Sequence, residues 1–234
     1  MRLSLPVHQR LGIYLSYAKD LRHLMVNWLN FTYDFDITMA KPKGKSGYVL
    51  TAGLVWISLV FAGFTILENE EFTPAPSAVV AQSFPSTSAL KLDASHSTLL
   101  LFVHPQCSCT EATFRELDQL RSNTGKNLAV IIIFPVPAHV AAGWENGALW
   151  SEAKKMAGVQ VYRDALGAET HRFGVITSGH TLLYSPTGQL LFSGGITMSR
   201  GHDGENPGVD AITRLIHGEY LTQRETPVFG CTLL

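Results

Sequence analysis

The sequence has few cysteines and little charge. Its 234 residues include three cysteines, and the four charged residue types together make up 16% of the chain. Three cysteines are too few to build a disulfide scaffold, so the chain must fold around an apolar core. The net charge of -1 gives no electrostatic reason to expect a nucleic-acid partner. The cysteines are therefore available for chemistry rather than for holding the fold together.

One stretch of the chain, residues 47–67, lacks charge and proline altogether and reads GYVLTAGLVWISLVFAGFTIL. As a helix it would span roughly 30 Å, the thickness of the apolar core of a bilayer. Three lysines precede the segment and three glutamates follow it: Lys41, Lys43, Lys45, Glu68, Glu70 and Glu71. Basic flanks stay on the cytoplasmic side. We therefore predict a single-pass inner-membrane protein with a cytoplasmic N-terminus and a periplasmic C-terminal domain.

Two alternatives concern the N-terminal end of the chain. A cleaved signal peptide would need a small-residue site close behind the apolar segment, and the nearest candidate, residues 79–81, lies well past it, which favours an uncleaved anchor. Residues 1–46 form the predicted cytoplasmic segment. Within residues 1–38, apolar residues recur at helical spacing, as in an amphipathic helix on the inner leaflet. Alternatively, translation begins at Met39.

The rest of the sequence predicts a linker and one α/β domain. Residues 68–96 are rich in Pro, Ser, Thr and Ala, so we expect an extended tether. Residues 97–234 form the domain. Its predicted elements are a strand at 98–103, a helix at 111–122, a strand at 128–134, a helix at 144–157, a strand at 159–162, hairpin strands at 181–184 and 189–192, and a helix at 207–220. This order predicts a mixed central sheet with helices on both faces.

The sequence Cys107-Ser108-Cys109 lies where the first strand of the domain passes into a helix. Backbone N–H groups at a helix start stabilise a thiolate and lower its pKa. We expect Cys107, at the more exposed start of the helix, to be the nucleophile and Cys109 to be the resolving thiol. The tail carries Cys231, which either resolves a disulfide with one of these two, pairs between chains, or is a free thiol.

With its cysteines at the first strand-to-helix turn, this order of elements resembles the thioredoxin fold. The chain departs from that family at two places. Thioredoxins have CxxC at this turn, whereas this chain has CxC, whose smaller ring would make a more strained and more oxidising disulfide. Thioredoxins also have a cis-proline before the hairpin strand, at the position that His180 occupies here.

A second resemblance involves copper. The stretch from His180 to Gly188 is similar to that of the Sco-type copper-delivery proteins, which are membrane-anchored thioredoxin folds. Those proteins hold copper with two cysteines and a histidine, so the resemblance implies a copper site formed by Cys107, Cys109 and His180. Thiolates and an imidazole suit Cu(I). The Sco cysteines are spaced CxxxC, however, and the CxC here differs from that spacing.

A glycine-rich loop at residues 193–206 follows the last hairpin strand. In a thioredoxin fold this loop lies on the same rim as the cysteine turn, and Arg200 or His202 could stabilise a thiolate or bind an anion. The alternative is a solvated loop in which Asn206 caps the next helix. This loop, the HPxCxC turn and the final FGC resemble the RedB-like group of membrane-anchored, thioredoxin-like bacterial proteins.

These observations favour a membrane-anchored, extracytoplasmic thiol-disulfide oxidoreductase. It would need no cofactor, and its partner would be a protein thiol or disulfide. Three side chains, His104, His180 and Arg200, would tune the cysteines. A copper metallochaperone and a non-catalytic, partner-binding thioredoxin-like module are the two alternatives.

Overall fold

The computed structural model describes residues 45–234, so the predictions for an amphipathic helix and for a start at Met39 lie outside the described residues. Helix α2 (Lys45–Phe72) contains the predicted span. Its segment Gly47–Phe72 is long and apolar enough to cross a membrane, with a mean hydropathy of 2.1. Its large apolar side chains are exposed, as those of a lipid-facing helix would be. The helix continues past residue 67 because glutamate is a good helix former.

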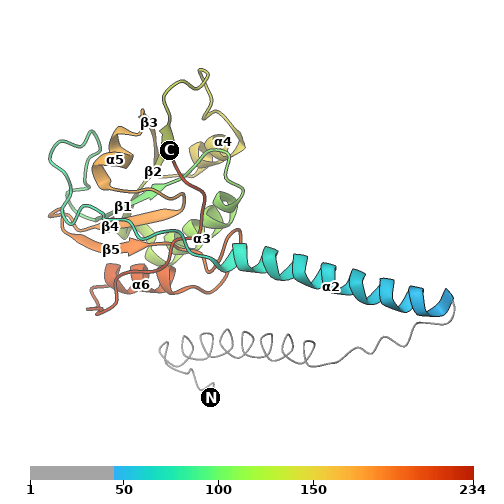
Figure 1. Ribbon diagram of the computed structural model, residues 1–234. Helices are drawn as coiled ribbons and strands as arrows, with labels where there is room; N and C mark the ends of the chain where they lie inside the picture. Colours follow the sequence, from blue (N-terminus) through green and yellow to red (C-terminus); the bar gives the residue numbers. More distant parts are fainter. Residues whose placement is uncertain (1–44) are drawn as a thin grey trace, which may run out of the picture. The chain divides into compact units, whose positions relative to one another are not determined.

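The domain is built around one five-stranded sheet (Figure 1). Its elements in chain order are β1 (Ser97–Phe102), α3 (Cys109–Thr124), the 3-10 turn η1 (Gly125–Asn127), β2 (Leu128–Val136), α4 (Ala148–Lys155), β3 (Val159–Ala165), α5 (Ala168–Phe173), β4 (His180–Tyr184), β5 (Leu190–Gly194) and α6 (Pro207–Ile216). The strand order is β3-β2-β1-β4-β5. Strands β1, β2 and β3 run parallel, and β4 runs antiparallel to β1 and β5. The predicted thioredoxin-like arrangement is confirmed.

The two faces of the sheet carry separate apolar cores. Successive side chains of a strand point to opposite faces, so Leu99 and Leu101 of β1 pack under α3, α4 and α6. Leu100 and Phe102 pack on the other face, which α5 covers together with segments from outside the sheet. Apart from Ser97, strand β1 is buried on both faces, as its unbroken apolar run predicts.

Much of the predicted linker packs on this second face. Val80 and Leu90 are buried there beside the residues of β1 and β4. The hydroxyl of Tyr184 donates a hydrogen bond to the carbonyl of Ala81 at 2.7 Å. Because α5 is short, apolar side chains of the linker are needed to cover the rest of this face. The packed domain therefore extends further toward the N-terminus than the boundary at residue 97.

Helix α5 has no counterpart among the predicted elements. The carboxylate of Asp164, at the end of β3, accepts hydrogen bonds from the backbone N–H groups of Glu169 and Thr170, at 2.9 and 2.8 Å. This contact from outside the helix satisfies the free N–H groups of its first turn. Glycines in the left-handed conformation flank the six-residue helix on both sides. A helix this short shows no apolar periodicity, although the flanking glycines were a usable signal.

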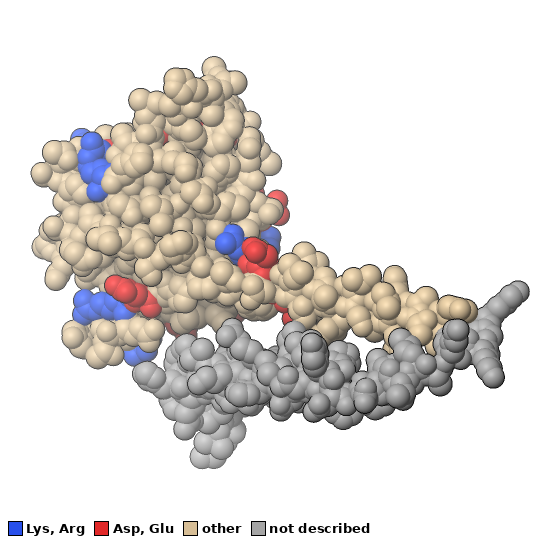
Figure 2. All heavy atoms as spheres, in the orientation of Figure 1, with Lys and Arg blue, Asp and Glu red and all other residues tan. Residues whose placement is uncertain are grey.

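Charged side chains are sparse on the surface of the domain. On the face that Figure 2 shows, Lys and Arg side chains occur in small separate groups, several of them beside acidic side chains. Two of the ion pairs of the domain are Arg115 with Asp203, and Arg214 with Glu219. This distribution agrees with the low charge content of the sequence.

Candidate functional site

The cysteine turn lies between β1 and α3, as predicted. The backbone N–H of Cys107 donates to the carbonyl of His104 at 3.2 Å, and the N–H of Thr110 donates to the carbonyl of Cys107 at 3.0 Å. Helix α3 begins at Cys109. The side chain of Ser108 makes no capping hydrogen bond to any described residue, so the first N–H groups of the helix remain available to a thiolate.

The C-terminal tail brings the third cysteine to this turn. The backbone N–H of Ser178, just before β4, donates to the carbonyl of Cys231 at 2.8 Å, and the N–H of Leu233 donates to the carbonyl of Ile176 at 3.0 Å. The side chain of Leu233 is buried, which anchors the end of the tail. Gly230 passes so close to Ser178 that a Cβ atom on Gly230 would lie 2.0 Å from its carbonyl oxygen. The backbone thus fixes the position of Cys231.

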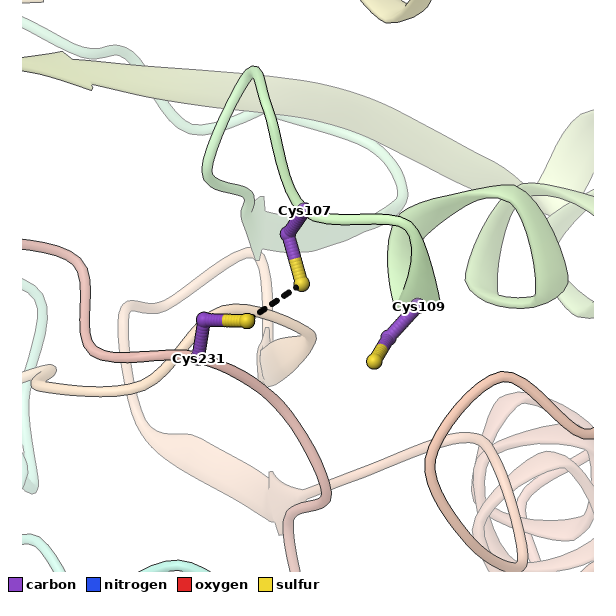
Figure 3. Close-up of side chains that lie close together, drawn as sticks. All are labelled: Cys107, Cys109 and Cys231. Carbon is purple, nitrogen blue, oxygen red and sulfur yellow. Dashed lines mark hydrogen bonds between the residues drawn. The ribbon is translucent and has the colours of Figure 1, made fainter. Parts of the chain in front are cut away.

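The three cysteines form one group, which we call the three-thiol site. The Sγ atoms of Cys107 and Cys231 are 3.0 Å apart, and all three Sγ atoms lie within 4.8 Å of one another. Figure 3 shows Cys107 and Cys231 pointing toward each other, with Cys109 beside them at the start of α3. All three are free thiols. Cys107 is 2% exposed, whereas Cys231 is exposed. The expectation that Cys107 lies at the more exposed position is wrong, because the tail covers it.

The three thiols differ in acidity. Burial acts to raise the pKa of Cys107, but hydrogen bonds from the thiol and backbone of Cys231, and from Cys109, outweigh it and lower that pKa. Burial and the neighbouring Cys107 thiolate raise the pKa of Cys109. Partial burial of its sulfur and the contact with Cys107 likewise raise the pKa of Cys231, to about 12. Cys107 is therefore the first of the three to become a thiolate, and the other two remain thiols beside it.

Two of the predicted supporting residues touch the framework of the site. The N–H of His104 donates to Ser178 Oγ at 2.9 Å, and its ring packs edge-on against Trp144 with the ring centres 5.2 Å apart. Burial lowers the pKa of His104, which favours the neutral ring. Arg200 donates from Nη1 to the carbonyl of Gly230 at 2.6 Å, which places its positive charge beside the tail. Arg200 is thus positioned to stabilise negative charge on the thiols.

His202 and the glycine-rich loop contact other groups. His202 Nδ1 lies 3.0 Å from Ser199 Oγ, within the loop. Asn206 caps α6 by accepting a hydrogen bond from the N–H of Val209 at 2.8 Å, so the alternative of a capping role for Asn206 is confirmed. The buried carboxylate of Glu116 in α3 accepts hydrogen bonds from Asn206 Nδ2, at 2.9 Å, and from the N–H of Gly204. Sequence reasoning missed Glu116, although a carboxylate four residues from both Ala112 and Leu120 on an apolar stripe was a signal.

His180 lies at the start of β4 in a different environment. Its side chain is 4% exposed, Nε2 lies 2.9 Å from Ser193 Oγ, and Nδ1 has no hydrogen-bond partner among the described residues. Burial lowers the pKa of His180 to about 4. The residue lines a cavity of about 310 Å³, which we call the His180 cavity, between linker residues 75–82 and tail residues 225–228. The group of ligand atoms at the three-thiol site does not include its imidazole.

The chain enters β4 without a cis-proline. Among residues 45–234 no peptide bond is cis. Just before His180, Gly179 has φ +85° and its N–H donates to the carbonyl of Phe102 at 2.8 Å. The loop that faces the cysteine turn therefore gets its shape from a glycine and from backbone hydrogen bonds to β1 and to the tail.

Comparisons with known proteins give the fold of the chain. No protein-family model matches the sequence, and no curated protein matches it. A hypothetical protein from Sinorhizobium meliloti 1021 has a similar structure, with a TM-score of 0.52 and 18% identity over 69% of this chain and 97% of that one. An uncharacterized conserved protein from Geobacillus kaustophilus gives a TM-score of 0.49 and 14% identity over 70% and 90% of the two chains.

A third solved structure is a putative thiol:disulfide interchange protein DsbE from Chlorobium tepidum. Its TM-score is 0.39, with 19% identity over 63% of this chain and 96% of that chain. Similarity at such identities concerns the fold alone. The order of elements and of strands is that of a thioredoxin-like fold.

Proposed function

We propose that this protein is an extracytoplasmic thiol-disulfide oxidoreductase that α2 anchors to the inner membrane. The observation that carries the proposal is the contact between Cys107, in the turn that leads into α3, and Cys231, whose Sγ atoms lie 3.0 Å apart. One of these two thiols has a lowered pKa and the other a raised pKa. A nucleophilic thiolate beside a thiol that can resolve its mixed disulfide is the arrangement that thiol-disulfide exchange requires.

The exchange would proceed in two balanced steps. The Cys107 thiolate attacks one sulfur of a partner disulfide, which forms a mixed disulfide and releases the other partner sulfur as a thiolate. Cys231 then loses its proton and attacks the Cys107 sulfur, which closes a Cys107–Cys231 disulfide and releases the second partner thiolate. The partner gains two electrons and the protein loses two. The reverse sequence oxidises a partner dithiol.

The geometry favours Cys231 rather than Cys109 as the resolving thiol. We predicted Cys109 from the sequence, but the closest sulfur contact of Cys107 is with Cys231. A disulfide between Cys107 and Cys109 would also close a small, strained ring. The backbone of this turn is already set by the start of α3 at Cys109. Cys109 remains close enough to lower the pKa of Cys107 through its backbone and thiol hydrogen bonds.

The burial of Cys107 adds a requirement for movement. At 2% exposure its sulfur is not accessible to a partner protein while the tail is in place. Two backbone hydrogen bonds hold the tail at this point, one at Cys231 and one at Leu233. We infer that partner binding displaces the segment around Cys231, and that closing the new disulfide returns it.

The compartment and the family are part of the same proposal. The lysines at and before the start of α2 and the glutamates near its end favour a periplasmic domain, where disulfides persist. The likeness of the cysteine turn, the glycine-rich loop and the FGC tail to RedB-like proteins supports the same placement. The partner would be a protein that carries a cysteine pair.

A glutathione redox titration tests the proposal. The full chain in detergent micelles is equilibrated with mixtures of reduced and oxidised glutathione, and its thiols are then alkylated and counted by mass spectrometry. We expect a two-electron transition that disappears in Cys107→Ser and persists in Cys109→Ser. The absence of any transition in the unmodified chain would leave the alternative of a non-catalytic partner-binding module.

A further inference from the structure

A disulfide couple uses two sulfur atoms, yet the structure brings three together. Whichever pair closes, one thiol takes no part in the bond, although it lies within 4.8 Å of both others. The three residues come from two segments far apart in the chain, the turn before α3 and the tail (Figure 3). Convergence of three soft donors on one point is what a thiophilic metal ion requires.

We propose that the reduced protein binds one Cu(I) ion through the thiolates of Cys107, Cys109 and Cys231. Metal–sulfur bonds of about 2.3 Å in a trigonal plane place the sulfur atoms about 4 Å apart. The Sγ atoms of Cys107 and Cys231 are 3.0 Å apart and all three Sγ atoms lie within 4.8 Å of one another, so side-chain rotations that change these separations by about 1 Å bring them to this spacing.

The type and the number of the donors favour Cu(I). Within residues 45–234, the group of His, Cys, Asp and Glu ligand atoms at this point contains the three thiols and no fourth member. Structural zinc takes four protein ligands in a tetrahedron, whereas three thiolates suit a soft, low-coordinate ion such as Cu(I). Arg200, which donates to Gly230 beside Cys231, supplies a positive charge that offsets the charge of the thiolates.

Binding involves no change of oxidation state. Cu(I) replaces the protons of the thiols, up to three protons are released, and the copper and the sulfur atoms keep their oxidation states. The inference goes beyond the proposed exchange reaction, because it needs all three thiols reduced and needs no partner disulfide.

This site differs from the copper site that the sequence resemblance implies, because Cys231 takes the place of His180. The imidazole of His180 bonds to Ser193 through Nε2 and lines the His180 cavity. The two ligand sets therefore give opposite expectations for two single variants, Cys231→Ser and His180→Gln.

The test is an anaerobic Cu(I) titration of the full, reduced chain in detergent against a chromogenic Cu(I) chelator. We expect one Cu(I) per chain, with the ultraviolet absorption of copper–thiolate bonds. Loss of a residue that only hydrogen-bonds to a metal ligand lowers metal affinity roughly 10- to 100-fold. Each cysteine-to-serine variant removes a ligand itself, so its Cu(I) affinity should fall by more than this. His180→Gln should bind as the unmodified chain does.

Three results would overturn the inference: no binding by the unmodified chain, undiminished binding in Cys231→Ser, or tighter binding of Zn(II) than of Cu(I) in the same competition. Circular dichroism of each variant shows that it is folded before its affinity is compared. A glutathione titration of the same metal-free samples separates the two proposals. A chain that binds copper but shows no redox transition would contradict exchange alone, and a chain that shows the transition but binds no copper would contradict copper binding alone.

Discussion

Residues 176–180 connect the three-thiol site with the His180 cavity: Ile176 and Ser178 hold the tail that carries Cys231, and His180 lines the cavity. The environments of the two regions differ. At the three-thiol site the backbone of Ser178 holds the tail, and three side chains of related chemistry lie against one another. Two residues later, His180 is buried with one nitrogen unpartnered among the described residues. Contact between titratable groups produces a reactive thiolate, whereas burial alone produces a neutral imidazole. We therefore propose that the thiols carry the chemistry and that His180 has a packing role.

The largest contrast should appear in exchange activity. We expect Cys107→Ser to abolish reduction of a model protein disulfide, because serine cannot form the mixed disulfide. His180→Gln should stay within about 3-fold of the unmodified chain, since its imidazole is not among the grouped ligand atoms of the three-thiol site. Rates of insulin-disulfide reduction measure both. A large loss in His180→Gln with the fold intact would remove the distinction between the two regions.

His180 should instead control stability at acidic pH. Its pKa is lowered from 6.5 to about 4, so the unfolded chain binds more protons than the folded chain between these values. Stability is therefore complete above pH 6.5 and falls as the pH drops toward 4, by up to about 3 kcal/mol. Urea unfolding of the full chain in detergent at pH 7 and pH 5 measures this loss, and His180→Gln should lose less. If the free energy of unfolding fell by the same amount between pH 7 and pH 5 in both proteins, the burial argument would be contradicted.

The position of the tail can be disturbed without changing a thiol. A Cβ atom on Gly230 would lie 2.0 Å from the carbonyl oxygen of Ser178, so Gly230→Ala must push the tail away, at a cost of about 1–3 kcal/mol. We expect Cys107 to react faster with iodoacetamide in this variant. Gly147→Ala is the matched control, because its Cβ would meet Pro105 at an ordinary 3.7 Å. Equal alkylation rates in the two variants would show that the tail does not shield Cys107.

The smallest effect concerns the acidity of Cys107. Cys231→Ala removes the thiol whose hydrogen bond stabilises the Cys107 thiolate, so the pKa of Cys107 should rise. Cys109→Ala should raise it less, because the hydrogen bonds from Cys109 contribute less than those from Cys231. Thiolate absorbance at 240 nm, followed against pH, reports both shifts. A larger rise in Cys109→Ala would reverse the ranking of the two neighbours.

Local pattern was sufficient to predict the fold and part of the site. The unbroken apolar runs of β1 and β2 gave buried strands, and the turn between β1 and α3 placed Cys107 and Cys109 correctly. These features depend on neighbouring residues, whose periodicity the sequence displays directly.

The position of Cys231 could not be predicted in the same way. It depends on backbone hydrogen bonds between the tail and residues 176–178, which lie more than fifty positions away and carry no periodic signal. The packing of the linker was equally hard to predict. Its composition indicated an extended tether, whereas its apolar side chains cover a face of the sheet that no helix fully covers. Contacts of this kind are set by tertiary packing.

The environment of His180 was within reach of the sequence. In a strand, residues at i, i+2 and i+4 share a face, so His180 lies on the same face as Leu182 and Tyr184. Both of these side chains belong to the core that the linker covers. The resemblance to copper-delivery proteins implied that His180 is a metal ligand, whereas the alternation along β4 indicated that His180 is buried.

The central claim is that Cys107 and Cys231 are the redox pair. Mild oxidation of the full chain with diamide, followed by non-reducing digestion and mass spectrometry, tests it most directly. We expect the turn peptide, which contains both Cys107 and Cys109, to be joined to the tail peptide through Cys107, with fragmentation locating the alkyl group on Cys109, because the sulfur atoms of Cys107 and Cys231 lie 3.0 Å apart. A disulfide between Cys107 and Cys109, with Cys231 alkylated, would contradict the claim.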